Sequence, residues 1–326
     1  MAILDLTSGG SLTYVLGPDH PAVVEAAGAG PDPAATAALT ARLEELTRMR
    51  VVAFCSSAEE ARKKALALAR ERTGREGVIG CRGTPVQPGT RLISHGDPLQ
   101  ARRAFSQDQP AAFAVEIIQA SAGACVPPPK YLSRLREACD DSGVQLVVDE
   151  TRTGFGRVGT FLAFQRERMK PDLVVLSLQL APGVDGGVVL AQPDGGPGSS
   201  SDKPDDIAGS DAVPAAAVAL AVLDVLDRDK LLGNVKALGK VLQKLVIDII
   251  ETRRTWAMDT RGRGLLRSLT LWDDPQIVLR AARERGLALG PTGNAAVLFA
   301  PPLTASEADL RETLALFDAV LADIES

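Results

Sequence analysis

Residues Phe113–Leu178 read FAVEIIQASAGACVPPPKYLSRLREACDDSGVQLVVDETRTGFGRVGTFLAFQRERMKPDLVVLSL, and their hydrophobic pattern decides the fold. Three short runs rich in valine, isoleucine and leucine begin near Phe113, Val144 and Leu173, and each predicts a strand. A helical stretch ending at Gly143 separates the first two runs. Near-continuous apolar strands that alternate with helices are typical of a parallel sheet covered on both faces. We therefore predict an α/β fold with a mostly parallel central sheet.

The same alternation continues on both sides of this stretch. The short apolar run Val51–Cys55 leads directly into SSAEEARKKALALARERTG, where a serine can cap the helix and two glutamates suit its positive end. A long helical run from Val213 is followed by the pattern strand, helix, strand, helix, which indicates an α+β unit. We predict an N-terminal arm (1–30), a large α/β domain (31–224) and a small C-terminal α+β domain (225–326).

The composition excludes several classes of function. The 326 residues are 45% hydrophobic and 24% charged, as in globular proteins, and the formal net charge of −5 argues against a nucleic-acid partner. No apolar run approaches the roughly 20 residues of a membrane span. Because the N-terminus also lacks a signal-peptide pattern, we expect a cytoplasmic protein without a membrane partner. Four unpaired cysteines and two histidines give no metal-site spacing, and the Ala/Gly/Arg richness suggests a bacterial gene.

Several segments resemble the class III aminotransferases, which use pyridoxal phosphate (PLP) on the fold type I scaffold. AFCSSAEEARKKALALAR (53–70) resembles the family pattern F-t-n-S-G-a-E-A-n-e-a-A-l-K-l-A-R, and residues 113–178 resemble the central block almost without gaps. RGRGLLRSLTL and VLFAPPLTASEADL resemble the closing motifs, while DTRGRG and ERGLALGPTG lean toward the diaminobutyrate aminotransferase branch. The resemblance implies the fold type I architecture and a homodimer with its sites at the subunit interface.

The resemblance also indicates which residues of this chain correspond to the family's cofactor site. Asp149 takes the place of the carboxylate that keeps the pyridine nitrogen protonated. Ser57 and Ala58 take the place of the Ser-Gly pair at a helix N-terminus that cradles the phosphate, and Gln119 remains from a further motif. After Glu76 the chain is shortened, and the family's ring-stacking aromatic loop is missing.

The catalytic lysine is absent from the place where the family has it. The family pattern P-D-i-V-t-L-s-K, aligned from Pro171, puts Leu178 at the lysine position, and a shift by one residue offers Gln179, neither of which can form a Schiff base. The threonine that reaches the partner subunit's phosphate corresponds to Gly209, and the basic residue for the substrate carboxylate corresponds to Leu298. We therefore expect a vestigial PLP site and no cofactor.

Two structural expectations accompany these losses. We expect Leu178 to point into the former cofactor pocket, with Leu180 and Val189 nearby, and the apolar run Val213–Leu226 to be shared between subunits. By contrast, the segment TGFGRVG (153–159) is kept almost intact. In the family this segment is largely structural, so we expect its glycines to make a tight turn and Arg157 to bond locally.

Three functions fit these observations. The first is a pseudoenzyme whose role is binding, as a homodimer, paired with an active aminotransferase paralogue, or with a small-molecule ligand in the old pocket. The second is a PLP-independent enzyme of bacterial specialised metabolism, in which Glu116, Asp149 and Glu150 do acid–base chemistry such as dehydration or cyclisation, and Arg152 and Gln179 bind the substrate. The third is an active PLP aminotransferase whose lysine lies elsewhere.

Overall fold

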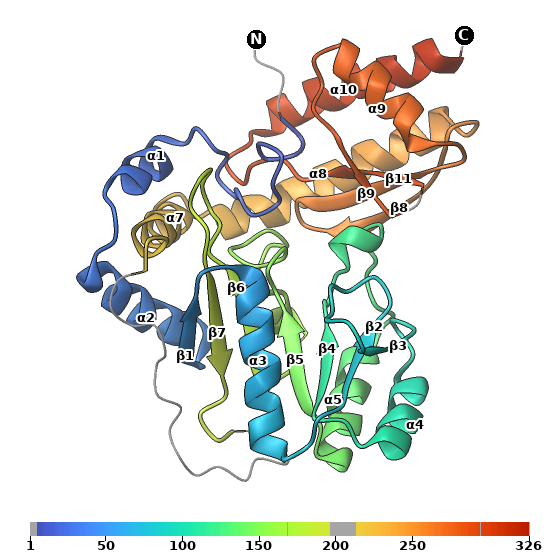
Figure 1. Cartoon of the computed structure of the whole chain (residues 1–326). Helices are drawn as coiled ribbons and strands as arrows, with labels where there is room; N and C mark the ends of the chain where they lie inside the picture. The colour runs from blue at the N-terminus through green and yellow to red at the C-terminus, as the bar shows by residue number, and fades with distance from the viewer. Residues whose placement is uncertain (1–4, 168, 196–212, 294, 326) are drawn as a thin grey trace.

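The computed structural model describes residues 5–167, 169–195, 213–293 and 295–325, and two sheets organise them (Figure 1). The larger sheet has seven strands in the order β1-β7-β6-β5-β4-β2-β3. Strand β7 pairs antiparallel with both β1 and β6, whereas the other neighbours pair in parallel. The predicted α/β fold with a mostly parallel central sheet is confirmed. The strands are β1 (Arg50–Cys55), β2 (Val78–Cys81), β3 (Arg91–Ile93), β4 (Ala112–Val115), β5 (Gln145–Asp149), β6 (Leu173–Ser177) and β7 (Gly187–Ala191).

Helices cover both faces of this sheet because its strands are apolar on both faces. In β5, Val147 packs with the alanine- and leucine-rich side of α3, whereas Leu146 and Val148 belong to the larger core on the opposite face. Helix α3 crosses the front of the sheet in Figure 1. The helices of this part are α1 (Pro21–Gly28), α2 (Pro33–Thr47), α3 (Ala58–Thr73), α4 (Pro98–Asp108), η1 (Ala120–Ala122), α5 (Tyr131–Ser142), α6 (Ala163–Arg166) and α7 (Ala216–Arg228).

The smaller sheet has four antiparallel strands in the order β10-β11-β9-β8 and lies with α8, α9 and α10 in the upper part of Figure 1. The N-terminal segment packs with this part of the molecule, since the Leu6 N–H donates to the Ala288 carbonyl and the Leu6 carbonyl accepts from the Ala300 N–H. The domain limits given above stay a prediction. The elements are α8 (Leu231–Thr252), β8 (Ala257–Arg263), β9 (Leu266–Leu271), α9 (Pro275–Glu284), β10 (Gly290–Thr292), β11 (Ala296–Phe299) and α10 (Glu307–Glu325).

Arg157 ties together three segments that are remote in the sequence. Its side chain is fully buried, and its guanidinium donates hydrogen bonds to the carbonyls of Pro301 and Leu12 and to the Ser8 hydroxyl. The expectation that Arg157 bonds locally holds only for its backbone N–H, which donates to the Gly154 carbonyl, because the partners of its side chain lie more than 140 positions away. The glycines of the same turn do allow a tight path, since Gly156 and Gly159 both have a φ of 90°. Arg157 thereby fixes the N-terminal segment against the main body.

The apolar face of α7 is covered within one chain. Helices α1 and α2 pack against it, and Val218, Val222 and Leu226 are buried without a second subunit. The expectation that this apolar run is shared between subunits is therefore not supported, because little of it is left to share. In the described ranges, no helix has both the length and the apolar character that crossing a membrane requires.

Candidate functional site

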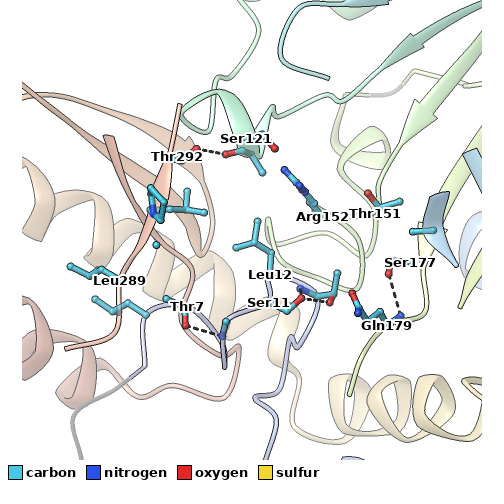
Figure 2. Close-up of a pocket in the computed structure, with 18 of the residues that line it drawn as sticks. Thr7, Ser11, Leu12, Ser121, Thr151, Arg152, Ser177, Gln179, Leu289 and Thr292 are labelled. Carbon is cyan, nitrogen blue, oxygen red and sulfur yellow. Dashed lines mark hydrogen bonds between the residues drawn. The ribbon is translucent and has the colours of Figure 1, made fainter. Parts of the chain in front are cut away.

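A cavity of about 750 Å³ opens where the N-terminal segment, the large sheet and the small sheet meet. Figure 2 shows Thr7, Ser11 and Leu12 on one side, Thr151, Arg152 and Gln179 on another, and Leu289 and Thr292 opposite. Its walls also include the start of α3 and the segment around η1. Because β5 and β6 end beside it, the cavity lies at the carboxyl edge of the parallel strands, where α/β proteins commonly bind ligands.

Asp149 stands at the end of β5 with both carboxylate oxygens engaged. Its Oδ2 lies 2.5 Å from Nε of Arg62, and its Oδ1 accepts a hydrogen bond of 2.9 Å from the backbone N–H of Thr151. Arg62 also donates from Nη2 to the Thr151 hydroxyl at 2.7 Å. The side chain of Asp149 is 6% exposed. Arg62 was missed by the sequence analysis, although the family pattern has an asparagine at that place, which was the available signal.

The first turn of α3 keeps the form of an anion cradle. Ser57 is the N-cap, and its hydroxyl accepts a hydrogen bond of 3.2 Å from the backbone N–H of Glu60. The Glu60 carboxylate in turn accepts hydrogen bonds from the Ser56 backbone and hydroxyl. Ala58, the next residue, lines the cavity. Gly187 of β7 allows this close packing, because a Cβ there would lie 2.5 Å from the Ser57 carbonyl oxygen.

Two predicted acid–base residues are buried away from the cavity. Glu150 is 1% exposed, and its carboxylate accepts hydrogen bonds from the Phe164 backbone and the Thr153 hydroxyl, while burial raises its pKa to about 7. Glu116 is also 1% exposed, and neither of its carboxylate oxygens has a hydrogen-bond partner in the described part of the chain. Burial, followed by the nearby charge of Asp149, raises the pKa of Glu116 to about 8. Since neither residue lines the cavity, this arrangement does not favour the acid–base alternative.

Arg152 and Gln179, the two predicted substrate-binding residues, do line the cavity. Arg152 extends toward Ser121 (Figure 2), and its guanidinium has no hydrogen bond or ion pair with any other described residue. Gln119, by contrast, is 2% exposed and donates from its amide to the Arg82 carbonyl at 2.7 Å and to the Thr84 hydroxyl at 3.0 Å. Gln119 therefore holds the loop that follows β2 and does not face the cavity.

Leu178 is fully buried in the larger core and is not among the residues that line the cavity. Its backbone N–H donates to the Gly186 carbonyl at 2.8 Å. The expectation that Leu178 points into the pocket is wrong, because its neighbours Ser177 and Gln179 line the cavity instead. Leu180 shares the larger core with it, whereas Val189 belongs to the core under α3.

Two further expected losses have different outcomes. Leu298 lines the cavity, so an apolar side chain stands where the resemblance places a basic residue. Gly209 lies outside the described residues. No lysine lines the cavity in the ranges that the structure describes. Lys63 lines a second, more apolar cavity of about 480 Å³ beside the sheet and α3, and it is paired with Glu59 at 2.6 Å.

The order of the large sheet, the position of Asp149 and the helix N-terminus beside the cavity together define a protein built like the PLP-dependent aminotransferases of fold type I. Residues 93–321 match the family "Aminotransferase class-III". The chain belongs to the class III aminotransferase family.

Relatives and solved structures agree with this family. The acetylornithine aminotransferase of Methanopyrus kandleri is 30% identical over 98% of this chain and 90% of its own length. The ornithine aminotransferase of rat is 30% identical over 72% of this chain, but only 54% of its own length is covered. The crystal structure of N-acetylornithine aminotransferase from Stenotrophomonas maltophilia superposes with a TM-score of 0.85 at 27% identity, covering 99% of this chain and 91% of that one. The leaning toward the diaminobutyrate branch is not supported by these relatives.

The family corrects the expectation that this chain takes no cofactor. Class III aminotransferases are PLP enzymes, so membership points to PLP. The ornithine aminotransferase of Toxoplasma gondii, whose own structure has partial occupancy of PLP at the active site, superposes with a TM-score of 0.84 at 24% identity, which shows a shared fold. When bound, PLP supplies an electron sink for amino-group transfer. The expectation was wrong because the helix N-terminus that suits a phosphate and the carboxylate of Asp149 are both retained.

The residues of this chain fit PLP only in part. The α3 N-terminus suits a phosphate, whereas Asp149, which takes the place of the family's partner for the ring nitrogen, lines the second cavity of about 480 Å³ and not the first. An amine for the Schiff base is missing at Leu178, and the Asp149 carboxylate already has a cation, Arg62, as its partner. The cradle is therefore retained, while the covalent anchor and the free carboxylate are not.

Proposed function

We propose that this chain is a degenerate class III aminotransferase, related to the acetylornithine and ornithine aminotransferases, whose role is binding and not amino-group transfer. The observation that carries the proposal is the lysine position. Leu178 is fully buried and bonded through its backbone to Gly186, just before β7, and no lysine of the described ranges lines the cavity. Without an amine, PLP in this cavity would be held by non-covalent contacts alone. Leu298 adds to the proposal, because a substrate carboxylate would meet an apolar side chain.

The arrangement of the cavity supports a small anionic ligand. Arg152 offers an unpaired guanidinium at its wall, and the hydroxyls of Ser11, Thr13 and Ser121 surround the same space. A guanidinium binds a carboxylate or a phosphate through two parallel hydrogen bonds. Retention of the cavity with these donors, beside the loss of the lysine, favours a binding role for the site.

Trapping the cofactor tests this proposal directly. The protein is incubated with PLP, reduced with borohydride and mapped by mass spectrometry, with an active acetylornithine aminotransferase treated in parallel. We expect the control to carry one phosphopyridoxyl group on one lysine and this chain to carry none in stoichiometric amount. Stoichiometric labelling of a single lysine, Lys63 included, together with conversion of ornithine or acetylornithine, would overturn the proposal.

Assembly forms a second part of the proposal. We infer a homodimer from the family resemblance, because fold type I sites lie at subunit interfaces. The large apolar side chains that are exposed among the described residues come from different elements, so they do not identify the interface; they are Val24, Leu92, Leu99, Ile247, Met258 and Trp272. Light scattering at micromolar concentration measures the mass. The mass of one chain would contradict the homodimer, and mixing with an active paralogue would then test pairing.

A further inference from the structure

Arg62 is the feature of this site that the proposed function leaves unexplained. It projects from the second turn of α3 and forms part of the wall of both cavities, whereas its partner Asp149 lines the second cavity only. Its side chain is only 22% exposed, and two of its nitrogens are committed, one to the Asp149 carboxylate and one to the Thr151 hydroxyl. An arginine side chain that rotated freely at the surface would not hold hydrogen bonds to two residues at the end of the same strand. The side chain is therefore held in place across the end of β5.

The position of the pair has a chemical consequence. In the resemblance, the Asp149 carboxylate is the group that pairs with the protonated nitrogen of a pyridine ring. Here Oδ2 is taken by a guanidinium at 2.5 Å, and Oδ1 is taken by the Thr151 backbone at 2.9 Å. A pyridinium at the same oxygen would lie against Arg62, and like charges at such a distance repel each other. A protonated ring that used Asp149 would therefore share the carboxylate with Arg62 and be weakened by this repulsion.

We propose that Arg62 is a built-in counter-cation and the residue that sets ligand specificity at this site. Because Arg62 occupies Asp149, the site favours a phosphate-bearing pyridine ligand whose ring nitrogen is unprotonated. The same ligand with a protonated ring nitrogen binds less well. The proposal deepens the proposed function and rests on it, because a protein that does not use a cationic ring as an electron sink loses nothing when Asp149 is occupied. PLP stays the family's ligand, and Arg62 governs how strongly its ring nitrogen is held.

The matched experiment uses pyridoxine 5′-phosphate, which has the ring and the phosphate but no aldehyde and so cannot bond covalently to any lysine. Calorimetry compares the native protein with Arg62→Asn, which carries the asparagine of the family pattern, and with Arg62→Lys, which keeps a cation. We expect Arg62→Asn to bind about tenfold more tightly than the native protein or more, since one charge-assisted hydrogen bond becomes available, and Arg62→Lys to stay close to the native protein.

The double variant Arg62→Asn/Asp149→Asn separates specificity from structure. Its gain in affinity over the native protein should vanish, because no carboxylate remains for the ring nitrogen. The ultraviolet spectrum of the bound ring should report a protonated nitrogen in Arg62→Asn and an unprotonated one in the double variant. A change that merely loosened the fold would lower the melting temperature without making the affinity depend on Asp149.

The outcomes are distinct from those of the trapping experiment. Equal or weaker binding by a cooperatively folded Arg62→Asn variant, or a gain that persists in the double variant, would overturn the role of Arg62 while leaving the proposed function standing. If Arg62→Asn does not fold, the native protein is tested with 1-deazapyridoxine 5′-phosphate, in which carbon replaces the ring nitrogen. The native protein should bind this analogue at least as tightly as pyridoxine 5′-phosphate, and clearly weaker binding would refute the proposal.

Discussion

Replacement of Glu116 by glutamine should change how the stability of this protein depends on pH. The Glu116 side chain is buried, and its carboxyl oxygens have no hydrogen-bond partner in the described ranges. Burial is the main cause of its raised pKa; Asp149 and Glu150 raise the pKa further, while Arg62 and Arg152 oppose them. The carboxyl group is therefore protonated in the folded protein at neutral pH, and glutamine reproduces its neutral form.

The size of the effect follows from proton linkage. The pKa of Glu116 is about 8 in the folded protein against an ordinary value of 4.5 in the unfolded chain. Between these values the folded state keeps a proton that the unfolded state has released, so the free energy of unfolding falls as pH rises from 4.5 to about 8. Each pH unit in this window costs up to about 1.4 kcal/mol. The whole window costs roughly 3 to 5 kcal/mol, which is a large part of the stability of a typical domain.

Urea unfolding of the native protein and of Glu116→Gln measures this directly. Well below pH 4.5, where Glu116 is protonated in both states, the two proteins should differ little, and the variant should gain stability over the native protein as pH rises to about 8. The difference should then stay constant. Parallel stability profiles across the whole window would refute the reasoning, because they would mean that the folded state does not hold a proton on Glu116.

Three other substitutions test the packing and the site. Arg157→Met should cost about 3 kcal/mol or more in urea unfolding, because it leaves the buried Pro301 carbonyl, the partly buried Leu12 carbonyl and the Ser8 hydroxyl without this donor. The exposed Arg254→Met should change stability by less than about 0.5 kcal/mol, and equal effects would refute the anchoring role. Gly187→Ala should cost about 2 kcal/mol, since the added Cβ would lie 2.5 Å from the backbone of the α3 N-cap. Gly233 lies on the exposed side of α8, where an added Cβ contacts nothing, so Gly233→Ala should gain about 0.5 kcal/mol. A neutral Gly187→Ala would show that β7 can shift. Leu178→Lys should destabilise the fold by several kcal/mol, because it places an amine in the apolar core. This variant should not restore transamination of ornithine or acetylornithine. A yellow, active variant at micromolar PLP would contradict the proposed function.

The main fold was predictable because its cause is local. The alternation of apolar strands with helices is visible in the order of residues along the chain. The apolar runs around Phe113, Val144 and Leu173 form β4, β5 and β6 of one sheet. The family followed from an unbroken block of motifs within one part of the sequence. The absence of a lysine at position 178 was likewise readable, since it is a fact about residue identity.

Only the tertiary structure decided which residues that are remote in the sequence come into contact. The pairing of Arg62 with Asp149 joins positions that are 87 apart, and the side-chain hydrogen bonds of Arg157 span 144 to 149 positions. Hydrophobic periodicity carries no information about such contacts, because it specifies which face of an element is buried but not which charged side chain the opposite element brings to it. For the same reason the sequence placed Leu178 at the site by homology, whereas packing turned it into the core and left Ser177 and Gln179 at the cavity wall.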